Sequence, residues 1–336
     1  RQMCIRDRRY EDYSDFGGTT NPKIALRWQP ASWIMLRASW TTSFLAPDFW
    51  QLYAPDTPSL YMLADTVRCE YTGLPEDCDG SAYPGIYGGN SDLEPEDGES
   101  WFAGMVWQPG FLPGFEFQLD FWEFDHSERI EWLHPQIVLD QGWDLGITRG
   151  PTEADGTPGR IMSVKESTWN LETFETRGFD TTLRYAWQTK KAGEFQASLM
   201  HTYIDRWIFT DSPYEEPFNY AGTELWVPTP RNRANFNLSW SLDSHQVALN
   251  LHYLGHYEAT WGSDVWVDGE DTDEPWDVPS QTTFGMQYVY TFEKLRNARL
   301  SIGCINCSGE IPPIKTTPTV FATTSASPYL DLRGRY

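Results

Sequence analysis

The sequence has no uninterrupted run of about 18 apolar residues, so no segment could cross a membrane as a helix. Its mean hydropathy is −0.53. A membrane β-barrel is still allowed, because each barrel strand turns only every second side chain towards lipid and its average hydropathy stays low. Apolar stripes at helical spacing are also missing, which favours an all-β chain.

Positive charge is scarce as well. The 336 residues include 25 lysines and arginines against 48 aspartates and glutamates, giving a formal net charge of −23. No nucleic-acid partner is expected, since phosphate binding needs clustered basic residues. Much of the acid lies in stretches 92–99 and 264–277. We interpret these as solvated loops, because the order of acids in 268–273 lacks the register of a calcium-binding loop.

Motifs of common enzyme classes are absent. The sequence contains no GxSxG, HExxH or GxxxxGK[ST], and its six histidines are scattered. Glu116 and Asp120 lie four positions apart, on the same face of one predicted strand, and could form an acid/base pair. The preferred interpretation is that they are solvated side chains. The sequence therefore predicts no catalytic residue, no metal ligand, no cofactor, and a protein that is not an enzyme.

Only five cysteines are present. Cys69 and Cys78 flank a polar, turn-rich stretch, and a disulfide between them would contribute about 2–3 kcal/mol in an oxidising compartment. Cys304 and Cys307 form a CxxC at the end of a strand-like run. A redox CxxC is typical of a helix start, and a zinc site needs a second ligand pair that we do not find. The redox state of this pair stays open.

Apolar and polar residues alternate with a period of two in many parts of the sequence. Phe115, Phe117, Leu119 and Phe121 are apolar, and the residues between them are polar. This pattern predicts a β-strand with one apolar and one polar face. Similar apolar faces occur in 34–40, 101–107, 179–187, 195–199, 236–240, 247–253, 284–290 and 298–302. About a dozen strands result, many near the ~9–11 residues that cross a bilayer at a tilt.

The connections between these strands alternate in length. Short turns follow Trp28, Trp107, Trp187 and Trp240, and long loops without predicted structure occupy 45–97, 134–159, 205–229 and 258–278. Such asymmetry is typical of an outer-membrane barrel. Four tryptophans at one rim predict an aromatic girdle at the membrane interface. A soluble sandwich would show the same alternation, but the asymmetry and the tryptophans favour lipid.

Seven motifs, in order along the chain, resemble those of TonB-dependent receptors of the bacterial outer membrane. They are Phe44 with Ala46-Pro47; Gly89-Asn90 with Leu93-Glu94-Pro95-Glu96; Thr176-Arg177-Gly178-Phe179-Asp180; Pro230-Arg231 with Arg233-Ala234-Asn235; Val278-Pro279-Ser280 with Thr283; Gly303, Asn306 and Pro312-Pro313; and Asp331 with Arg333-Gly334-Arg335-Tyr336. The family usually has Leu-Phe-Asp where this chain has Cys307-Ser308-Gly309. The resemblance covers nearly all of 10–336 and only the C-terminal half of the family barrel.

The resemblance implies an antiparallel transmembrane β-barrel of about 22 strands. This chain would supply about 12 of them as an open sheet. We interpret residues 1–8, which include Cys4, as a non-native leader. Residues 9–336 would then be the C-terminal part of the barrel, without the plug domain, the TonB box and the N-terminal strands.

The function implied by the resemblance is active import of a scarce solute across the outer membrane of a Gram-negative bacterium. The solute would be a siderophore, cobalamin, haem or an oligosaccharide. Expected partners are outer-membrane lipid, the TonB complex through the missing N-terminal region, and the small-molecule or oligosaccharide ligand. Two alternatives stay open: a passive porin or structural barrel, and a secreted carbohydrate-binding β-protein.

Ligand contacts are expected from aromatic residues of the long loops, which could stack on rings of a solute. The candidates are Trp50, Tyr53, Tyr71, Tyr87, Trp143, Trp207, Tyr214, Trp261 and Trp266, with Tyr61, Tyr83, Tyr220 and Trp276 as further members of the same region. The acidic loops disfavour strongly anionic ligands, unless Arg68, Arg149 or Arg160 create a local positive field.

Overall fold

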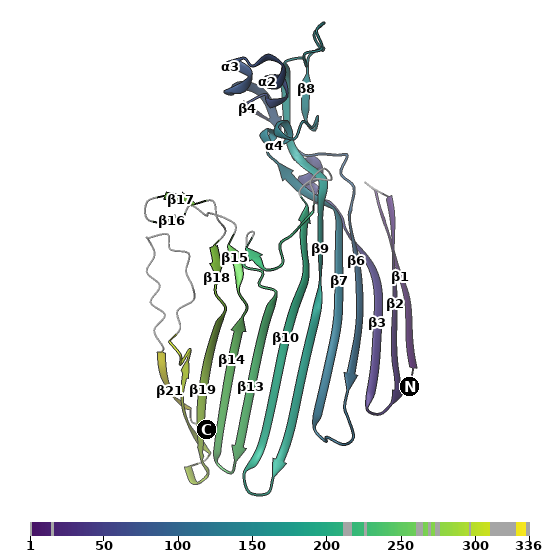
Figure 1. Cartoon of the computed structure of the whole chain (residues 1–336). Helices are drawn as coiled ribbons and strands as arrows, with labels where there is room; N and C mark the ends of the chain where they lie inside the picture. Colours follow the sequence, from purple (N-terminus) through teal and green to yellow (C-terminus); the bar gives the residue numbers. More distant parts are fainter. Residues whose placement is uncertain are drawn as a thin grey trace.

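One curved antiparallel sheet dominates the chain (Figure 1), which confirms the predicted all-β, open partial barrel. The computed structural model describes residues 2–14, 17–210, 217–224, 227–259, 265–267, 270–272, 276–295, 297–309 and 327–333. Twelve long strands lie side by side in the order β1 (Gln2–Tyr13), β2 (Gly17–Ala31), β3 (Ile34–Leu45), β6 (Glu96–Trp107), β7 (Phe115–Leu133), β9 (Ile161–Thr189), β10 (Gly193–Thr210), β13 (Asn232–Leu242), β14 (His245–Leu254), β19 (Gln281–Phe292), β20 (Ala298–Ile305) and β21 (Ser327–Arg333).

Short turns join the long strands at one end of the sheet, and long segments join them at the other (Figure 1). The turn from β9 to β10 needs a glycine. Gly193 has φ +80°, and a Cβ there would collide with the Ser241 carbonyl of β13. Asp243, in the next short turn, has φ 49°, a left-handed conformation that short polar residues tolerate. The predicted alternation of short and long connections therefore depends on residues in the short turns that tolerate a positive φ.

Each long strand has an apolar and a polar face, and the register aligns these faces across strands. Leu183 of β9 lies opposite Phe117 of β7 and Leu199 of β10. Phe117, Leu183, Trp240 and Leu249 are all partly exposed, and none belongs to the buried core of the described residues. A sandwich would bury this face under a second sheet, so the structure is not a two-layer soluble sandwich.

The main hydrophobic core lies beyond the long-segment end of the sheet. Residues 46–96 and 134–160, with the adjoining ends of β7 and β9, form what we call the loop lobe (Figure 1). It contains α1 (Phe49–Tyr53), β4 (Thr57–Leu63), α2 (Thr66–Thr72), α3 (Pro75–Cys78), β5 (Ser81–Tyr87), α4 (Pro135–Asp140) and β8 (Ile147–Arg149). Its core consists of Tyr61, Leu63, Leu133, Val138, Leu139, Ile147, Ile161 and Val164.

The expectation that 45–97 and 134–159 lack structure is therefore wrong. The small sheet β4-β5-β9-β8 buries one face against the helices of the lobe. The apolar residues that form this core are spread over several short elements. No single stretch is long enough to show a period, which explains why the sequence pattern did not reveal the lobe.

The helices α1 and α2 of the lobe begin at aspartates that act as capping residues. Asp48 accepts a hydrogen bond from the Gln51 backbone N–H at 2.7 Å, and Gln51 accepts one from the Asp48 N–H at 2.8 Å, forming a capping box at α1. At α2 the Asp65 side chain accepts a hydrogen bond from the Arg68 backbone N–H at 3.1 Å, and Gly73 ends the helix in the left-handed conformation. Within the described residues, no helix is long and apolar enough to cross a membrane.

Smaller strands occupy the remaining long connections: β11 (Phe218–Asn219), β12 (Thr223–Glu224), β15 (Tyr257–Ala259), β16 (Val265–Val267), β17 (Glu270–Thr272) and β18 (Trp276–Val278), while η1 (Glu293–Leu295) lies in a short turn. The strands at the edges of the described sheet are β1 and β21. Residues 2–8, proposed as a leader, pair with 22–28 of β2 as the first half of β1. Their native or non-native origin stays a prediction.

Candidate functional site

The polar face of the sheet carries an ion pair that spans three strands. Arg37 of β3 reaches across β6, where its Nη2 donates to both oxygens of Asp120 on β7 at 2.9 and 2.7 Å. Gly104 lies between them in register, and a Cβ there would collide with Asp120. Asp120 is 6% exposed. The prediction that its carboxylate is solvated is wrong, because Arg37 and the Gln118 amide enclose it.

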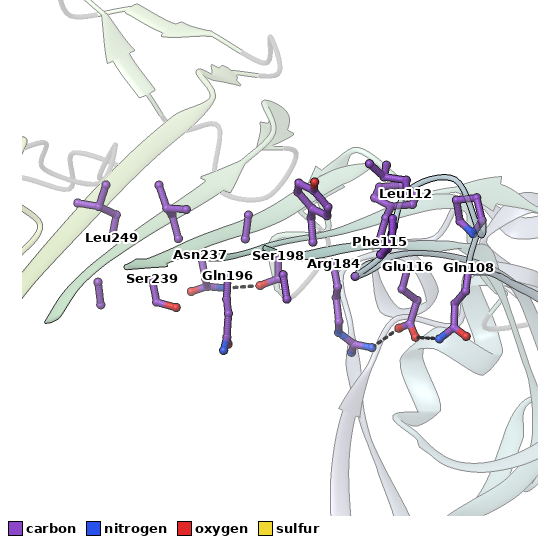
Figure 2. A pocket seen from close by; sticks show the side chains of 18 of the residues that line it. Gln108, Leu112, Phe115, Glu116, Arg184, Gln196, Ser198, Asn237, Ser239 and Leu249 are labelled. Carbon is purple, nitrogen blue, oxygen red and sulfur yellow. Dashed lines mark hydrogen bonds and ion pairs between the residues drawn. The ribbon is translucent and has the colours of Figure 1, made fainter. Parts of the chain in front are cut away.

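Near the short turns, the polar face forms an open hollow of about 840 Å³. Figure 2 shows its polar side chains pointing to one side of the sheet, whereas Leu112, Phe115 and Leu249 point to the other. Glu116 accepts hydrogen bonds from Arg184 at 2.7 Å and from Gln108 at 2.8 Å. Other residues lining the hollow include Gln196, Ser198, Asn237 and Ser239. These side chains give the hollow a hydrogen-bonding wall, and the bonds to Glu116 hold Arg184 and Gln108 in place.

Two buried ion-pair networks organise the loop lobe. Arg149 donates from Nη1 and Nη2 to the two oxygens of Asp65 at 2.7 and 2.8 Å. Arg68 is 4% exposed and donates to Asp77 at 3.2 Å and to Glu153 at 2.7 Å. The hydrogen bond to Glu153 is the main cause that raises the pKa of the Arg68 guanidinium. Both arginines are therefore structural cations of the lobe.

Tyr61 lies in the same core, and its hydroxyl donates to the Ile86 carbonyl at 3.2 Å. Burial, followed by the neighbouring Glu166, raises the pKa of Tyr61 to about 12. The hydroxyl is therefore neutral in the physiological range and acts as a hydrogen-bond donor inside the core. Tyr61 belongs to the packing of the lobe rather than to its exposed surface.

The structure joins Cys69 to Cys78, the pair expected from the sequence, and this disulfide connects α2 to α3. It also joins Cys304 to Cys307 at the end of β20, the pair whose redox state the sequence left open. Cys4 is a free, exposed thiol in β1.

Replacing both Cys69 and Cys78 by serine is expected to lower the free energy of local unfolding of α2 and α3 by about 2–3 kcal/mol, since the closed loop is short. Hydrogen exchange of the amides of these two helices measures the loss. Cys4→Ser is the matched control and is expected to leave the same amides unchanged. Equal exchange in both variants would show that the disulfide does not stabilise this part of the lobe.

The aromatic residues proposed as ligand contacts differ in their exposure. Trp50, Tyr53 and Tyr71 project from α1 and α2 with 63%, 55% and 63% of their surface exposed. Tyr87 is half-buried in β5. Trp143, like Tyr83, packs against the lobe core. Trp207 contacts Phe174 edge to face at 4.9 Å; Tyr220 is half-buried after β11.

Tyr214 and Trp261 lie outside the described residues, and for Trp266 and Trp276 only the backbone, in β16 and β18, is described. The structure thus brings the exposed aromatic residues of α1 into the loop lobe, and it places Trp143 and Tyr61 in packing roles. Whether any of these residues contacts a ligand stays a prediction.

The four girdle tryptophans all lie at the short-turn end of the long strands. Trp107 contacts Phe115, Trp187 stacks on Phe195 at 4.9 Å, and the Trp240 indole donates to the Ala192 carbonyl. Trp28 is 47% exposed on β2. Their assignment to a membrane interface stays a proposal.

A second aromatic pair, missed in the sequence, marks the other end of the same apolar face. Trp40 and Trp101 lie opposite each other in register, and both indoles donate to Glu99, at 2.8 and 2.6 Å. In the sequence, the apolar run 34–40 ends at Trp40 and the apolar run 101–107 begins at Trp101. These positions were the signal from which the second pair could have been predicted. The carboxylate of Glu99, which accepts both hydrogen bonds, marks the limit of the apolar band.

Across the described ranges, no group of three or more His, Cys, Asp or Glu is placed to hold a metal ion. Glu116 and Asp120, the one carboxylate pair weighed as an acid/base couple, are each held by an arginine.

Comparison with known proteins is consistent with this geometry. The family model described as "TonB dependent receptor-like, beta-barrel" matches residues 8–307. No curated protein matches the chain.

Among solved structures, the chain is similar to the siderophore receptor PirA from Acinetobacter baumannii, with 15% identity and a TM-score of 0.60 over 92% of this chain and 40% of that one. It is similar to a variant of the ferric enterobactin receptor PfeA from Pseudomonas aeruginosa, with 14% identity and a TM-score of 0.58 over 92% and 37%. The FrpB iron transporter from Neisseria meningitidis matches with 9% identity and a TM-score of 0.51 over 88% and 35%. The chain thus spans about two fifths of each structure or less, and these identities establish the fold alone.

Proposed function

The chain belongs to the TonB-dependent receptor β-barrel family, whose model matches 8–307, and from this premise we propose that it is part of a receptor importing a scarce solute across the outer membrane of a Gram-negative bacterium. The solute class proposed is a metal chelate such as a siderophore, with cobalamin, haem or an oligosaccharide as members of the same range of cargo. The energy would come from the TonB complex, through a region outside this chain.

The observation that carries the proposal is the two-sided sheet. Its apolar face is uncovered over strand after strand, and tryptophans lie at both of its limits. Its polar face is cross-linked by Arg37–Asp120 and Arg184–Glu116. A closed barrel with lipid outside and water inside needs this arrangement. The solved structures with the same fold are described as a siderophore receptor, a ferric enterobactin receptor and an iron transporter.

Uptake by cells tests the proposal. A strain lacking the full-length receptor that contains this chain is expected to lose uptake of its cargo under iron limitation, and the intact gene restores it. Restored uptake should stop when a protonophore collapses the proton gradient or when TonB is deleted. Uptake that continues under both conditions would favour the passive porin, the alternative function. Recovery of the full-length product from the supernatant rather than the outer membrane would overturn both.

A further inference from the structure

We infer that the loop lobe selects for cationic or uncharged cargo and rejects polyanionic cargo, such as iron complexes of catecholates; this inference rests on the proposed function. The segments that form the lobe are strongly acidic. Residues 46–96 and 134–160 hold 14 aspartates and glutamates and three arginines, and the adjoining end of β9 adds Lys165 and Glu166. A mouth lined by one sign of charge raises the local concentration of solutes of the opposite sign and repels those of its own.

The surroundings of the three arginines show whether they create a local positive field for an anionic ligand, a point that the sequence left open. Arg68 is buried between Asp77 and Glu153, Arg149 is bound by both oxygens of Asp65, and Arg160 faces Glu76 at 3.4 Å. A guanidinium that is buried and paired has its donors committed to protein carboxylates and can offer few to an anionic solute. Arg68 and Arg149 are therefore not available as the positive centre that a polyanion would require. Arg160 is exposed, and the neighbouring carboxylate of Glu76 offsets its charge.

Many of the carboxylates, in contrast, are exposed. Among the described residues, no lysine or arginine forms an ion pair with Asp56, Glu70, Asp79, Asp92, Glu94 or Asp144, all of them exposed. Exposed aromatic rings, which attract cations through their faces, occur on α1 as Phe49 and Trp50. The surface of the lobe thus offers negative charge and ring faces, whereas Arg68 and Arg149 are internal.

A thiol placed on the lobe measures this field without knowledge of the cargo. In the full-length receptor with Cys4→Ser, Ser91→Cys introduces an exposed thiol beside Asp92. We compare its reaction rates with a cationic and an anionic methanethiosulfonate reagent. Dividing the two rates cancels any change in the thiol's own pKa. The ratio is expected to exceed that of a free thiol about tenfold.

Neutralising four exposed carboxylates, Asp56→Asn, Glu70→Gln, Asp79→Asn and Asp92→Asn, is expected to reduce this ratio about threefold or more at low salt. The matched control is Asp243→Asn at the short-turn end, which should not change it. A Gly110→Cys reporter at that same end, where an added side chain meets no neighbour, should be insensitive to the four changes. A ratio at or below the free-thiol value on the lobe overturns the inference.

Uptake provides the second readout. Cells expressing the receptor are supplied with three iron(III) complexes: a trihydroxamate with a free ammonium group, an uncharged trihydroxamate, and a trianionic tris-catecholate. Receptor-dependent uptake of either of the first two, at least tenfold above the third, supports the inference. Faster uptake of the tris-catecholate overturns it while leaving the proposed function intact. Absence of receptor-dependent uptake of all three speaks against iron as cargo, and the thiol ratio still decides the charge selection.

Discussion

Replacing Leu183 by arginine is expected to lower the free energy of unfolding of the full-length receptor in lipid vesicles by about 2–4 kcal/mol. Leu183 lies within the apolar band of β9, between Phe117 and Leu199 on the neighbouring strands. A guanidinium there would lie in hydrocarbon, where its hydration is lost. Urea titration monitored by tryptophan fluorescence measures the change.

The matched control is the adjacent residue. Thr182 pairs with Gln118 and Met200 on the polar face, so Thr182→Arg places the same charge in the watery interior, at an expected cost below about 1 kcal/mol. The difference between the two variants, rather than either value alone, reports which face meets lipid. Equal losses would contradict the assignment of the apolar face to hydrocarbon, and with it the transporter proposal.

Asp65→Ala is expected to destabilise the loop lobe by about 3–5 kcal/mol. Asp65 is fully buried, receives both Nη atoms of Arg149, and caps α2. Its removal leaves a cation that is largely buried without a partner and leaves a helix end uncapped. Native-state hydrogen exchange of the β4 and β5 amides measures the loss, which should be confined to the lobe.

Glu76→Ala removes the acidic partner of an exposed ion pair in the same lobe. Glu76 and Arg160 are both largely exposed and lie 3.4 Å apart, so the expected loss is below about 1 kcal/mol. The two variants each delete one acidic partner of an arginine and differ mainly in burial. If Glu76→Ala proved as costly as Asp65→Ala, the lobe would not depend on its buried pair.

Several features could be predicted from local patterns. The alternation in 115–121 predicted an apolar and a polar face, and β7 has both. The short turn between Trp187 and Gly193 predicted adjacent antiparallel strands, and β9 and β10 pair there. Such patterns suffice because strand periodicity and turn conformation depend on residues within a few positions of each other.

Other features could not be predicted. The lobe core collects residues from β4, α4, β8 and the ends of β7 and β9, and no stretch among them shows a period. Arg68 and Arg149 were candidate ligand cations in the sequence, and the structure commits both to carboxylates. Asp120 was expected to be solvated, and an arginine 83 positions away encloses it.

The sequence by itself determined the class of fold, the faces of the strands and the end of the sheet at which the tryptophans gather. Only the tertiary structure decided which charges of the loop lobe are internal and which are exposed. The physical reason is distance along the chain: Asp65 and Arg149 are 84 positions apart, and an ion pair between them exists only once the small sheet and helices of the lobe have brought them together. The charge that the lobe presents to a solute is therefore a property of the fold rather than of its composition.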